Sequence, residues 1–562
     1  MRQEPSISRA RAKKSSVVAA AILALSVPAF GQTGHLDTGT AVQGATAQQA
    51  GTIRLSSDDA VKLAIEQNLG IQIARVNPQI QDVAVAQARS FWSPNFTSTL
   101  QRNSNTSAAT SALAGGATSV DTGTVGGSLG MNQVLPWGGS YAANWQSQRS
   151  TTTNLFSSFS PQLGSQLNLN YTQPLLRNFK IDDIRQRVAI NQKGRQIADV
   201  DLHSSMVQTA RLAKNAYWDL VYRIDNLRAT RQSLELAQQS LKDNTRRVEI
   251  GTMAPIDIVD AKAEVARNEE AVIVAQAQIE QAQDTLKTII FDPATPNFWG
   301  IRIDPTETAP FQTQAIDVDA AVRNALDKRT DLRDAKLSID QSDIQLRYFK
   351  NDVLPDVNAF VNYITTGVGG VQLSPVDPFA ISTGVVPTRS IVAQRSFGSV
   401  LGDVLQSTYP NWTAGIQINY PLGTSTSKAN LERAKLQYQQ SQTQVKNLEM
   451  QITAQVRAAA RQVEANQKRV ESARASRELQ EEKLAAEEKK FAAGIRETFF
   501  VFQAQRDLAT SRSAEVQAIA DYNKSLVDFQ AVQEVNLNGG GGNVINAGSG
   551  TVLTGTQAIV RQ

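Results

Sequence analysis

Few side chains in this sequence could carry out nucleophilic or metal chemistry. The 562 residues include no cysteine, five methionines and two histidines, His35 and His203, which lie far apart in the chain. Thiolate ligands and disulfides are therefore excluded, and the sequence has no cluster of His and Met for a soft metal. Only carboxylates, Ser, Lys or Tyr remain for catalysis, and no catalytic spacing stands out among them. The sequence predicts a protein that is not an enzyme and needs no cofactor or metal.

The first 31 residues have the layout of a secretory signal peptide. A basic segment, 9–14, precedes an apolar run of eleven residues, 17–27, and small residues follow at 29–31. A disordered basic tail is the alternative. The segment has a net charge of +4, which equals that of the whole chain. The remaining protein is close to neutral, so the pI near 9.0 gives no argument for binding nucleic acid.

The two halves of the chain repeat one another. At an offset of 261 residues, Ala60-Val61-Lys62 lies over Ala321-Val322-Arg323; at an offset of 243, Gly251 lies over Gly494. Each copy reads as a helix, an extended region, a very long helix, a glycine turn and a returning helix. The alternative is chance similarity between Ala/Gln-rich helices, and the matched proline and glycine positions argue against it.

The repeat defines the predicted organisation of the chain. A signal peptide (1–31) and a flexible leader (32–54) precede a first repeat (55–300), a linker (301–316), a second repeat (317–535) and a disordered Gly-rich tail (536–562). The first repeat has strands at about 94–174, a long helix at 181–250, a tip at 251 and a returning helix at 255–290. The second has strands at about 356–421, a long helix at 427–493, a tip at 494 and a returning helix at 498–535.

Apolar residues recur every seven positions on both sides of each tip, which predicts coiled-coil seams. In the first copy these are Leu220, Leu227, Leu234, Leu241 and Val248, then Ile258, Val265, Val272, Ile279 and Leu286. In the second they are Val463, Val470, Arg477, Leu484 and Phe491, then Val501, Leu508, Glu515, Tyr522 and Phe529. The two charged members, Arg477 and Glu515, indicate either a wetter seam or a shift of register.

The extended regions alternate apolar and polar residues. Trp412, Ala414, Ile416, Ile418 and Tyr420 are separated by polar residues or glycine. About ten residues suffice for a tilted strand to cross a bilayer, provided that the strands close into a barrel. One chain has too few strands for that, so membrane crossing would require an oligomer. The Ser/Thr/Gly-rich stretches 103–124 and 365–408 are predicted to be surface loops. A soluble β-sandwich on a helical stalk is the alternative.

In the order of its helices, extended regions and glycine turns, repeated twice, the chain resembles the TolC-type outer-membrane factor family over about residues 55–536. The segments that carry the resemblance are Ala60 to Asn68, Pro94, Tyr171-Thr172-Gln173-Pro174-Leu175-Leu176-Arg177, Tyr420-Pro421-Leu422-Gly423 and the turns at Gly251 and Gly494. The resemblance implies a mainly α fold with a β-barrel part. Each protomer of a homotrimer would give four strands to a 12-stranded transmembrane β-barrel in the outer membrane. Its long antiparallel coiled-coil helices would form an α-barrel in the periplasm.

The resemblance also implies a function and partners. The protein would be the exit duct of a tripartite efflux or type I secretion system, working with a periplasmic adaptor protein and an inner-membrane transporter. A structural coiled-coil rod or adhesin with a soluble β-head is the alternative. The substrate, and the choice between efflux and secretion, do not follow from the sequence.

Two groups of site residues follow from the resemblance. The adaptor would dock at the tips, which are Gly251, Thr252, Met253 and Ala254, and Gly494, Ile495 and Arg496. Some family members have a pore-lining aspartate pair where this chain has Phe500 and Gln503, so Phe499, Phe500 and Phe502 are candidates for an apolar constriction instead. Asp257 and Asp260 occupy the equivalent place in the first copy, where stabilisation of a helix N-terminus is the simpler explanation.

The first copy has four extended segments and the second has two. The additional hairpin, at about 125–149, would turn at Pro136-Trp137-Gly138-Gly139. We expect it to be an extracellular addition, and a wider barrel is the alternative.

Overall fold

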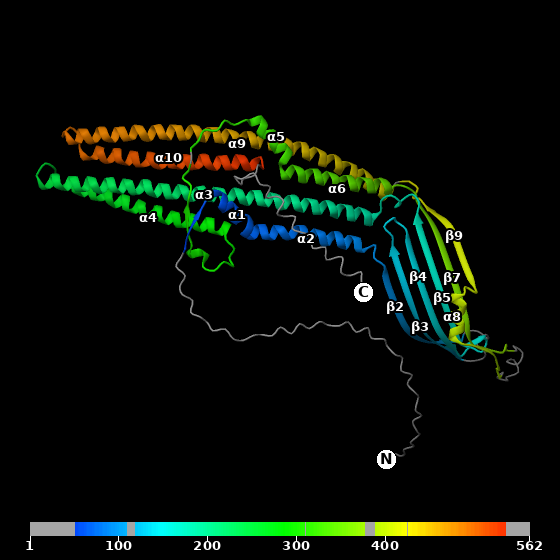
Figure 1. Cartoon of the computed structure of the whole chain (residues 1–562). Helices are drawn as coiled ribbons and strands as arrows, with labels where there is room; N and C mark the ends of the chain where they lie inside the picture. Colours follow the sequence, from blue (N-terminus) through cyan, green and yellow to red (C-terminus); the bar gives the residue numbers. More distant parts are fainter. Residues whose placement is uncertain (1–50, 110–117, 310, 377–387, 424, 535–562) are drawn as a thin grey trace, which may run out of the picture. The chain divides into compact units, whose positions relative to one another are not determined.

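The computed structural model describes residues 51–109, 118–309, 311–376, 388–423 and 425–534. The predicted signal peptide, residues 32–50 of the predicted leader and the Gly-rich tail lie outside the described residues. The described part is mainly helical, with one large sheet (Figure 1). None of its helices is both long and apolar enough to cross a membrane.

Two helices of 67 residues dominate the fold, and each is followed by a returning helix of 35 residues. They are α3 (Asp183–Glu249) with α4 (Ile256–Ile290), and α9 (Thr426–Ala492) with α10 (Thr498–Val532). At about 1.5 Å rise per residue, α3 and α9 are each roughly 100 Å long. Asp183 and Thr426, where they begin, are 243 positions apart, which equals the second offset found in the sequence.

The shorter helices follow the other offset. Before each long helix lies a pair: α1 (Ser57–Gln67) with α2 (Leu69–Ser90), and α5 (Val318–Lys328) with α6 (Thr330–Asp352). Ser57 and Val318 are 261 positions apart, as are Leu69 and Thr330. Side chains cap these helices at equivalent positions. Ser56 accepts a hydrogen bond from Asp59 N at the start of α1, and Asp317 accepts one from Ala320 N at the start of α5.

The core of the helical part lies along the heptad seams. Leu220 and Leu286 are fully buried in one cluster, and Val463, Val470 and Tyr522 are fully buried in another. In each hairpin the two arms pack along their length, and α10 also packs against α3 (Figure 1). Polar contacts hold this second interface, including Lys524 Nζ to Asp219 Oδ1 at 2.7 Å.

The ends of the predicted leader and linker form a small parallel strand pair. β1 (Thr52–Leu55) pairs with β6 (Arg302–Pro305), which follows a short 3-10 helix, η2 (Phe298–Gly300). The predicted leader, 32–54, therefore extended too far, and the predicted linker, 301–316, contains a strand. The hydroxyl of Tyr217 on α3 donates a hydrogen bond to Leu55 O at 3.2 Å, and burial raises the pKa of Tyr217 to about 12. This contact joins the strand pair to α3.

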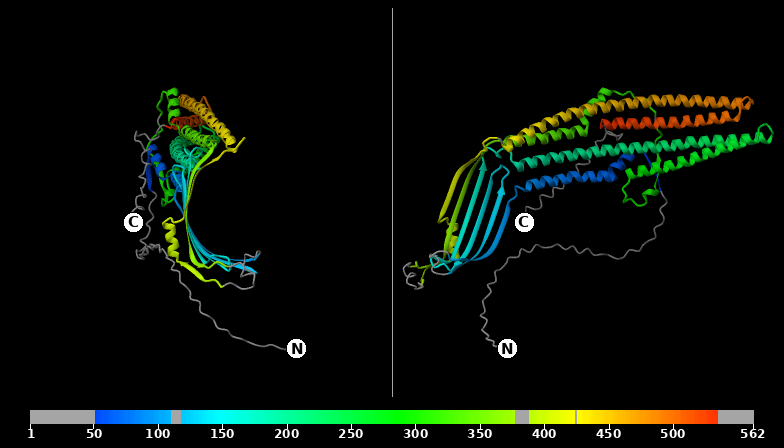
Figure 2. Two further views of the ribbon diagram at one scale, coloured as in Figure 1. Left: turned by 90° about the vertical axis from the view of Figure 1, so that its right-hand side faces the viewer. Right: turned by 180° about the vertical axis from the view of Figure 1, so that it is seen from behind.

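The large sheet is antiparallel throughout. Its order is β2–β3–β4–β5–β7, with both β8 and β9 on the far side of β7. The strands are β2 (Asn95–Ala108), β3 (Ser119–Val134), β4 (Ser140–Thr152), β5 (Phe159–Pro174), β7 (Asp356–Leu373), β8 (Ile391–Arg395) and β9 (Pro410–Asn419). The sheet is curved, and helix α8 (Phe397–Leu405) lies on its convex side (Figure 2).

The prediction of long loops at 103–124 and 365–408 was wrong for most of these residues. β2 continues to Ala108, β3 begins at Ser119, β7 continues to Leu373, and β8 and α8 follow. The Ser/Thr/Gly composition was misleading because every second strand residue here faces away from the apolar side of the sheet. On that face small polar residues, including the good strand former Thr, are compatible with a strand.

The hairpin expected at about 125–149 is formed by β3 and β4, which lie inside the large sheet between β2 and β5. β3 pairs with β2, and β4 with β5, along nearly their whole lengths. Its turn lies beside the start of α3, where Gly138 (φ +93°) approaches Asn178 O and the guanidinium of Arg185. A hydrogen bond of 2.7 Å from Gln133 Nε2 to Trp92 O attaches the hairpin to the end of α2. The turn therefore lies at the helix end of the sheet.

Candidate functional site

One face of the sheet is apolar across six strands in register. Following the pairing from β2 to β9 through β3, β4, β5 and β7 gives one continuous row: Phe96, Met131, Ala143, Leu169, Tyr363 and Trp412. Phe96 is 67% exposed and Trp412 is 71% exposed, although both are large and apolar. An exposed apolar patch of this extent indicates contact with a membrane or another protein.

The opposite face of the sheet is polar. The next row, one residue away on every strand, consists of Asn95, Asn132, Ala142, Asn170, Asn362 and Thr413. Side chains of successive strand residues point to opposite faces, so this row faces the concave side. The row after that on the same face is again mainly small and polar, with Ile364 as its exception. Alternation between an apolar outer and a polar inner face is typical of strands that separate lipid from an aqueous channel.

Both edges of this sheet are open. Among the described residues, β2 pairs with β3 alone, and β9 with β7 alone. Every residue of β2 is exposed, as are nine of the ten residues of β9. Unpaired N–H and C=O groups on long edge strands readily pair with another chain. Within the described residues, one chain therefore forms an open arc and not a closed barrel.

The apolar face also carries α8. Val400, which is fully buried, packs over Gly367 and Gly369 of β7, and a Cβ on Gly367 would lie 2.2 Å from Val400 O. Thr365 Oγ1 donates to Val404 O at 3.4 Å. Leu405, at the helix end, is 74% exposed. The helix thus covers a strip of small residues and presents apolar side chains of its own.

The two tips have the same local geometry. Gly251 (φ +74°) and Gly494 (φ +70°) each follow a long helix in the left-handed conformation that glycine adopts without strain. Thr252 N donates to Arg247 O at 2.8 Å, and Ile495 N donates to Lys490 O at 3.0 Å. These are the six-residue hydrogen bonds of Schellman motifs, which satisfy the last carbonyls of a helix.

The tips lie close to one another and carry exposed apolar side chains. The guanidinium of Arg247, at the end of α3, lies 4.4 Å from the ring centroid of Phe491 at the end of α9. Ile250 is 73% exposed and Ile495 is 75% exposed. Of the other predicted tip residues, Thr252, Ala254 and Arg496 are exposed and Met253 is partly exposed.

The predicted constriction residues divide into two groups. Phe499 is 58% exposed, and Phe500 is 38% exposed and lies under the guanidinium of Arg496 at 4.2 Å. Phe502 is only 4% exposed, so its proposed place in an apolar constriction was wrong. Gln503 donates to Asp507 Oδ1 at 2.9 Å on the exposed side of α10. Asp257 and Asp260 lie in the first two turns of α4; Asp257 is partly exposed and Asp260 is exposed.

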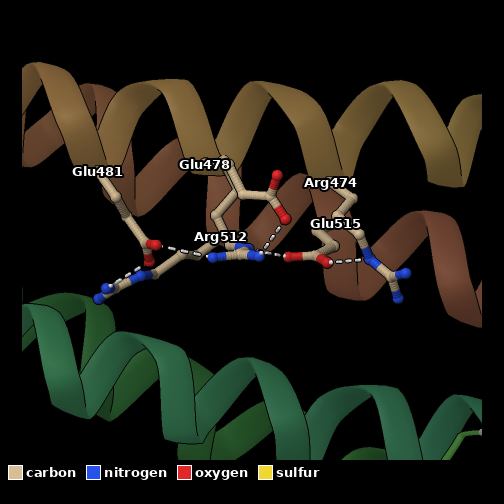
Figure 3. Close-up of polar contacts among 6 residues, drawn as sticks. Arg474, Glu478, Glu481, Arg512 and Glu515 are labelled. Atoms are coloured by element: carbon tan, nitrogen blue, oxygen red, sulfur yellow. Dashed lines mark hydrogen bonds and ion pairs between the residues drawn. The ribbon is translucent and has the colours of Figure 1, made fainter.

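The charged seam residues, Arg477 on α9 and Glu515 on α10, pair with each other (Figure 3). Arg477 Nε donates to Glu515 Oε2 at 2.5 Å, while Val470 and Leu484 stay buried one heptad away on either side. The register therefore does not shift at this point. The sequence placed both residues in the seam but did not show that they face each other. Because each lies seven residues from apolar seam neighbours, their pairing could have been predicted.

Four more charged residues extend this pair into a network, which sequence reasoning missed. Arg477 also contacts Glu481 and Glu478, Arg512 contacts Glu481, and Arg474 contacts Glu515 (Figure 3). The hydrogen bond from Arg512 lowers the pKa of Glu481. A cavity of about 480 Å³ lies beside the network, between α3, α9 and α10. In the described part of the chain, no group of three His, Asp or Glu residues could hold a metal ion.

The fold and this surface define a class: a mainly helical protein whose sheet has one apolar face, one polar face and two open edges. The family model for outer membrane efflux proteins matches residues 138–290 and 321–532. The chain belongs to the outer membrane efflux protein family. No match was found among curated protein sequences.

Solved structures share the fold. The outer-membrane channel OprN is 16% identical with a TM-score of 0.58, and the match covers 86% of this chain and 90% of OprN. The VceC outer membrane protein of Vibrio cholerae is 14% identical with a TM-score of 0.58, covering 86% and 96%. The CmeC outer membrane channel of Campylobacter jejuni is 13% identical with a TM-score of 0.56, covering 85% of each chain. These identities support a common fold and carry no argument about substrate.

Proposed function

We propose that this chain is the protomer of a homotrimeric channel in the bacterial outer membrane. The observation that carries the proposal is the apolar row from Phe96 to Trp412, which runs in register across a curved sheet with two open edges. β2 and β9 run in opposite directions, because an odd number of antiparallel pairings separates them. β9 of one protomer can therefore pair antiparallel with β2 of the next, and three arcs close a barrel without an edge.

The helices form the periplasmic part of the duct in this proposal. α3, α4, α9 and α10 supply two hairpins for each protomer, and side-by-side packing in a trimer forms an α-barrel. The matching bounds of the helices in 55–300 and 317–535, together with two matches to one family model, support a tandem duplication. Two hairpins of equal length, ending in the same turn, suit a tube with an even rim.

The channel serves as the exit duct of a tripartite efflux or type I secretion system. A periplasmic adaptor protein docks at the tips, Gly251 to Ala254 and Gly494 to Arg496, and an inner-membrane transporter supplies the cargo. Exposed Ile250 and Ile495 give the adaptor an apolar contact at each tip. Phe499 and Phe500 narrow the pore near this end, and Gln503, Asp257 and Asp260 line the same region.

The rival function is a coiled-coil rod or adhesin with a soluble β-head. A soluble head would cover the apolar face of its sheet with a second layer. In the described residues, α8 covers a strip near Gly367 and no second sheet packs on the rest of the apolar face. This observation favours the channel.

Fractionation of cells that express the full-length chain tests the proposal. We expect the mature protein in the outer membrane, and extraction in detergent as a trimer whose mass is measured by light scattering. Recovery as a soluble periplasmic monomer would contradict both the location and the assembly. A matched variant, Trp412→Asp, places a charge in the apolar row and should insert poorly, whereas Thr413→Asp on the polar face should insert normally.

A further inference from the structure

We infer that the hairpin β3–β4 is part of the membrane wall, so that three protomers close a barrel of 18 strands. The inference rests on the proposed trimeric channel and deepens it. Each protomer contributes β2, β3, β4, β5, β7 and β9, instead of the four strands that the family resemblance implied. β8 is not counted because it pairs only with the last residues of β7 and does not extend along the rest of that strand.

The two faces of the hairpin have the same chemistry as those of the rest of the sheet. Leu129 and Met131 of β3, and Ala143 and Trp145 of β4, lie on the apolar face, while Asn132 and Asn144 lie on the polar face. Trp145 also buries its indole N–H by donating to Ser165 Oγ of β5 at 2.8 Å. A hairpin outside the membrane would not need an apolar face that continues the apolar rows of the neighbouring strands.

The turn of the hairpin lies at the end of the sheet where a short turn is expected. The hairpin reverses over 135–139, where Leu135 N donates to Gly139 O at 2.7 Å, at the end of the sheet that meets the helices. The connections at the other end, after β2, β4 and β7, are longer. Short turns on the periplasmic side and longer loops outside are the usual arrangement of outer-membrane barrels. The short β3–β4 turn therefore lies at the helix end of the sheet, which is the periplasmic side in the proposed channel, as expected for a pair of membrane strands.

The strand directions also allow the hairpin to be part of the wall. β2 runs away from the helices and β5 runs back toward them, so these two strands would be antiparallel even without the hairpin. Adding β3 and β4 keeps the number of strands even, and the outer edges, β2 and β9, still meet antiparallel in a neighbouring protomer. The hairpin thus enlarges the wall without changing how protomers join.

The consequence is a wider outlet. With strands about 4.8 Å apart and tilted by about 40°, the backbone radius is roughly 12 Å for 12 strands and roughly 18 Å for 18 strands. The cross-section of the membrane section rises about twofold. Selection by size then belongs to the helical end of the duct, and the outlet admits bulkier solutes than a 12-stranded barrel would.

Cysteine labelling tests the inference directly, because the chain has no natural cysteine. Asn132→Cys and Met131→Cys place a thiol on the polar and apolar faces of β3, and Asn362→Cys and Tyr363→Cys do so in the same two rows on β7. In intact outer membranes, a water-soluble maleimide should label Asn132→Cys and Asn362→Cys at least tenfold faster than their apolar-face partners. Equal labelling of both β3 variants, or of neither, overturns the inference.

The β7 pair separates this result from failure of the proposed function. If the two β7 variants also label equally, the sheet does not cross the membrane and the channel proposal fails. If the β7 pair differs and the β3 pair does not, only the wide barrel fails.

A deletion measures the pore. Removing residues 113–154 joins β2 to β5 through one loop and leaves four wall strands. Polymers of increasing size, added to the extracellular side of single channels, should be excluded from the deletion variant at a radius at least 1.5-fold smaller than from the wild type. An equal exclusion limit overturns the inference, and if the deletion variant does not assemble, the labelling experiment decides.

Discussion

Arg477 and Glu515 are the two seam residues whose charges replace apolar contacts. Their side chains are 24% and 14% exposed, so removing one partner leaves a poorly hydrated charge. We expect Arg477→Leu to destabilise the folded chain by roughly 1–3 kcal/mol, while Arg477→Leu with Glu515→Leu is close to neutral. Thermal unfolding of the three proteins checks this. An equal loss of stability in the single and double variants would mean that the charge left unpaired on Glu515 costs nothing.

Glu481 makes the same region sensitive to acid. The hydrogen bond from Arg512 lowers its pKa below the ordinary value of 4.5, so the unfolded chain binds the proton more tightly. Stability from this group is complete above about pH 4.5 and is lost as the pH falls through the lower pKa of the folded state. The unfolding temperature of the wild type should fall more steeply below pH 4.5 than that of Glu481→Gln. Parallel curves would show that Glu481 has no part in the acid response.

The tip glycines separate docking from assembly. Both have φ near +70°, which proline cannot adopt, and a Cβ added at either position would meet no atom within 4 Å. We expect Gly251→Pro and Gly494→Pro to abolish export while the trimer still assembles. The alanine variants at the same positions, which cost about 1 kcal/mol in the left-handed conformation, should retain export. Normal export by both proline variants would remove the docking assignment.

Phe500 tests the pore constriction. Its ring is partly exposed at the start of α10, beside Phe499. A carboxylate there attracts cations, so Phe500→Asp should raise cation selectivity in planar bilayers. Phe502→Asp is not a usable comparison because Phe502 is buried. Gln503→Glu adds a carboxylate on the exposed side of the same helix, in the region proposed to line the pore, and should shift selectivity in the same direction. Unaltered selectivity in Phe500→Asp would place residue 500 away from the pore.

Among the elements, α8 depends on two glycines in β7. A side chain at Gly367 would overlap the backbone of Val400, so Gly367→Val should displace α8 without breaking the ladder, because valine favours strands. Limited proteolysis of the trimer should then cut near α8, with Gly402→Ala, which meets no atom within 4 Å, as the resistant control. A Gly367→Val trimer as resistant as the wild type would show that the helix can shift and repack.

The sequence was most informative about elements with long, regular patterns. α3 spans Asp183–Glu249 against a predicted 181–250, and α9 spans Thr426–Ala492 against 427–493, because no proline interrupts either helix and a glycine follows its C-terminal end. The membership in an efflux protein family was likewise predicted correctly. The alternation of apolar and polar residues from Trp412 to Tyr420 indicated β9.

Elements defined by their neighbours could not be predicted. The position of the β3–β4 hairpin depends on which strands lie beside it, and alternation within one strand carries no such information. α8 is nine residues long, contains two glycines and follows a Ser/Thr-rich stretch, so no helical period could develop. Phe502 was misplaced because neighbouring phenylalanines on a helix face in different directions, and only the packing of α10 against other helices decides which one is buried.

At the scale of the whole molecule, the described chain combines an open arc of strands with two matched helical hairpins. Arg185 fixes the passage from sheet to helix, since its guanidinium donates to Asn178 O at 2.7 Å and Phe179 O at 2.9 Å. Arg177, in the same connection, pairs with Asp352 at the end of α6 at 2.5 Å. The passages from β5 to α3 and from α6 to β7 are thereby tied together, so a shift of the helices would act on the strands through these contacts.

The pair Arg477–Glu515 has one more consequence, which concerns how a chain with two similar halves finds its own partners during folding. The short tip after α9 favours its pairing with α10, but the seams of both hairpins share the same spacing, so apolar contacts alone would also fit α9 to α4. At 243 positions earlier, Leu234 and Val272 replace Arg477 and Glu515. A crossed pairing would leave Arg477 against Val272, or Glu515 against Leu234, with a buried and unmatched charge. One ion pair therefore distinguishes the correct hairpin from its near copy.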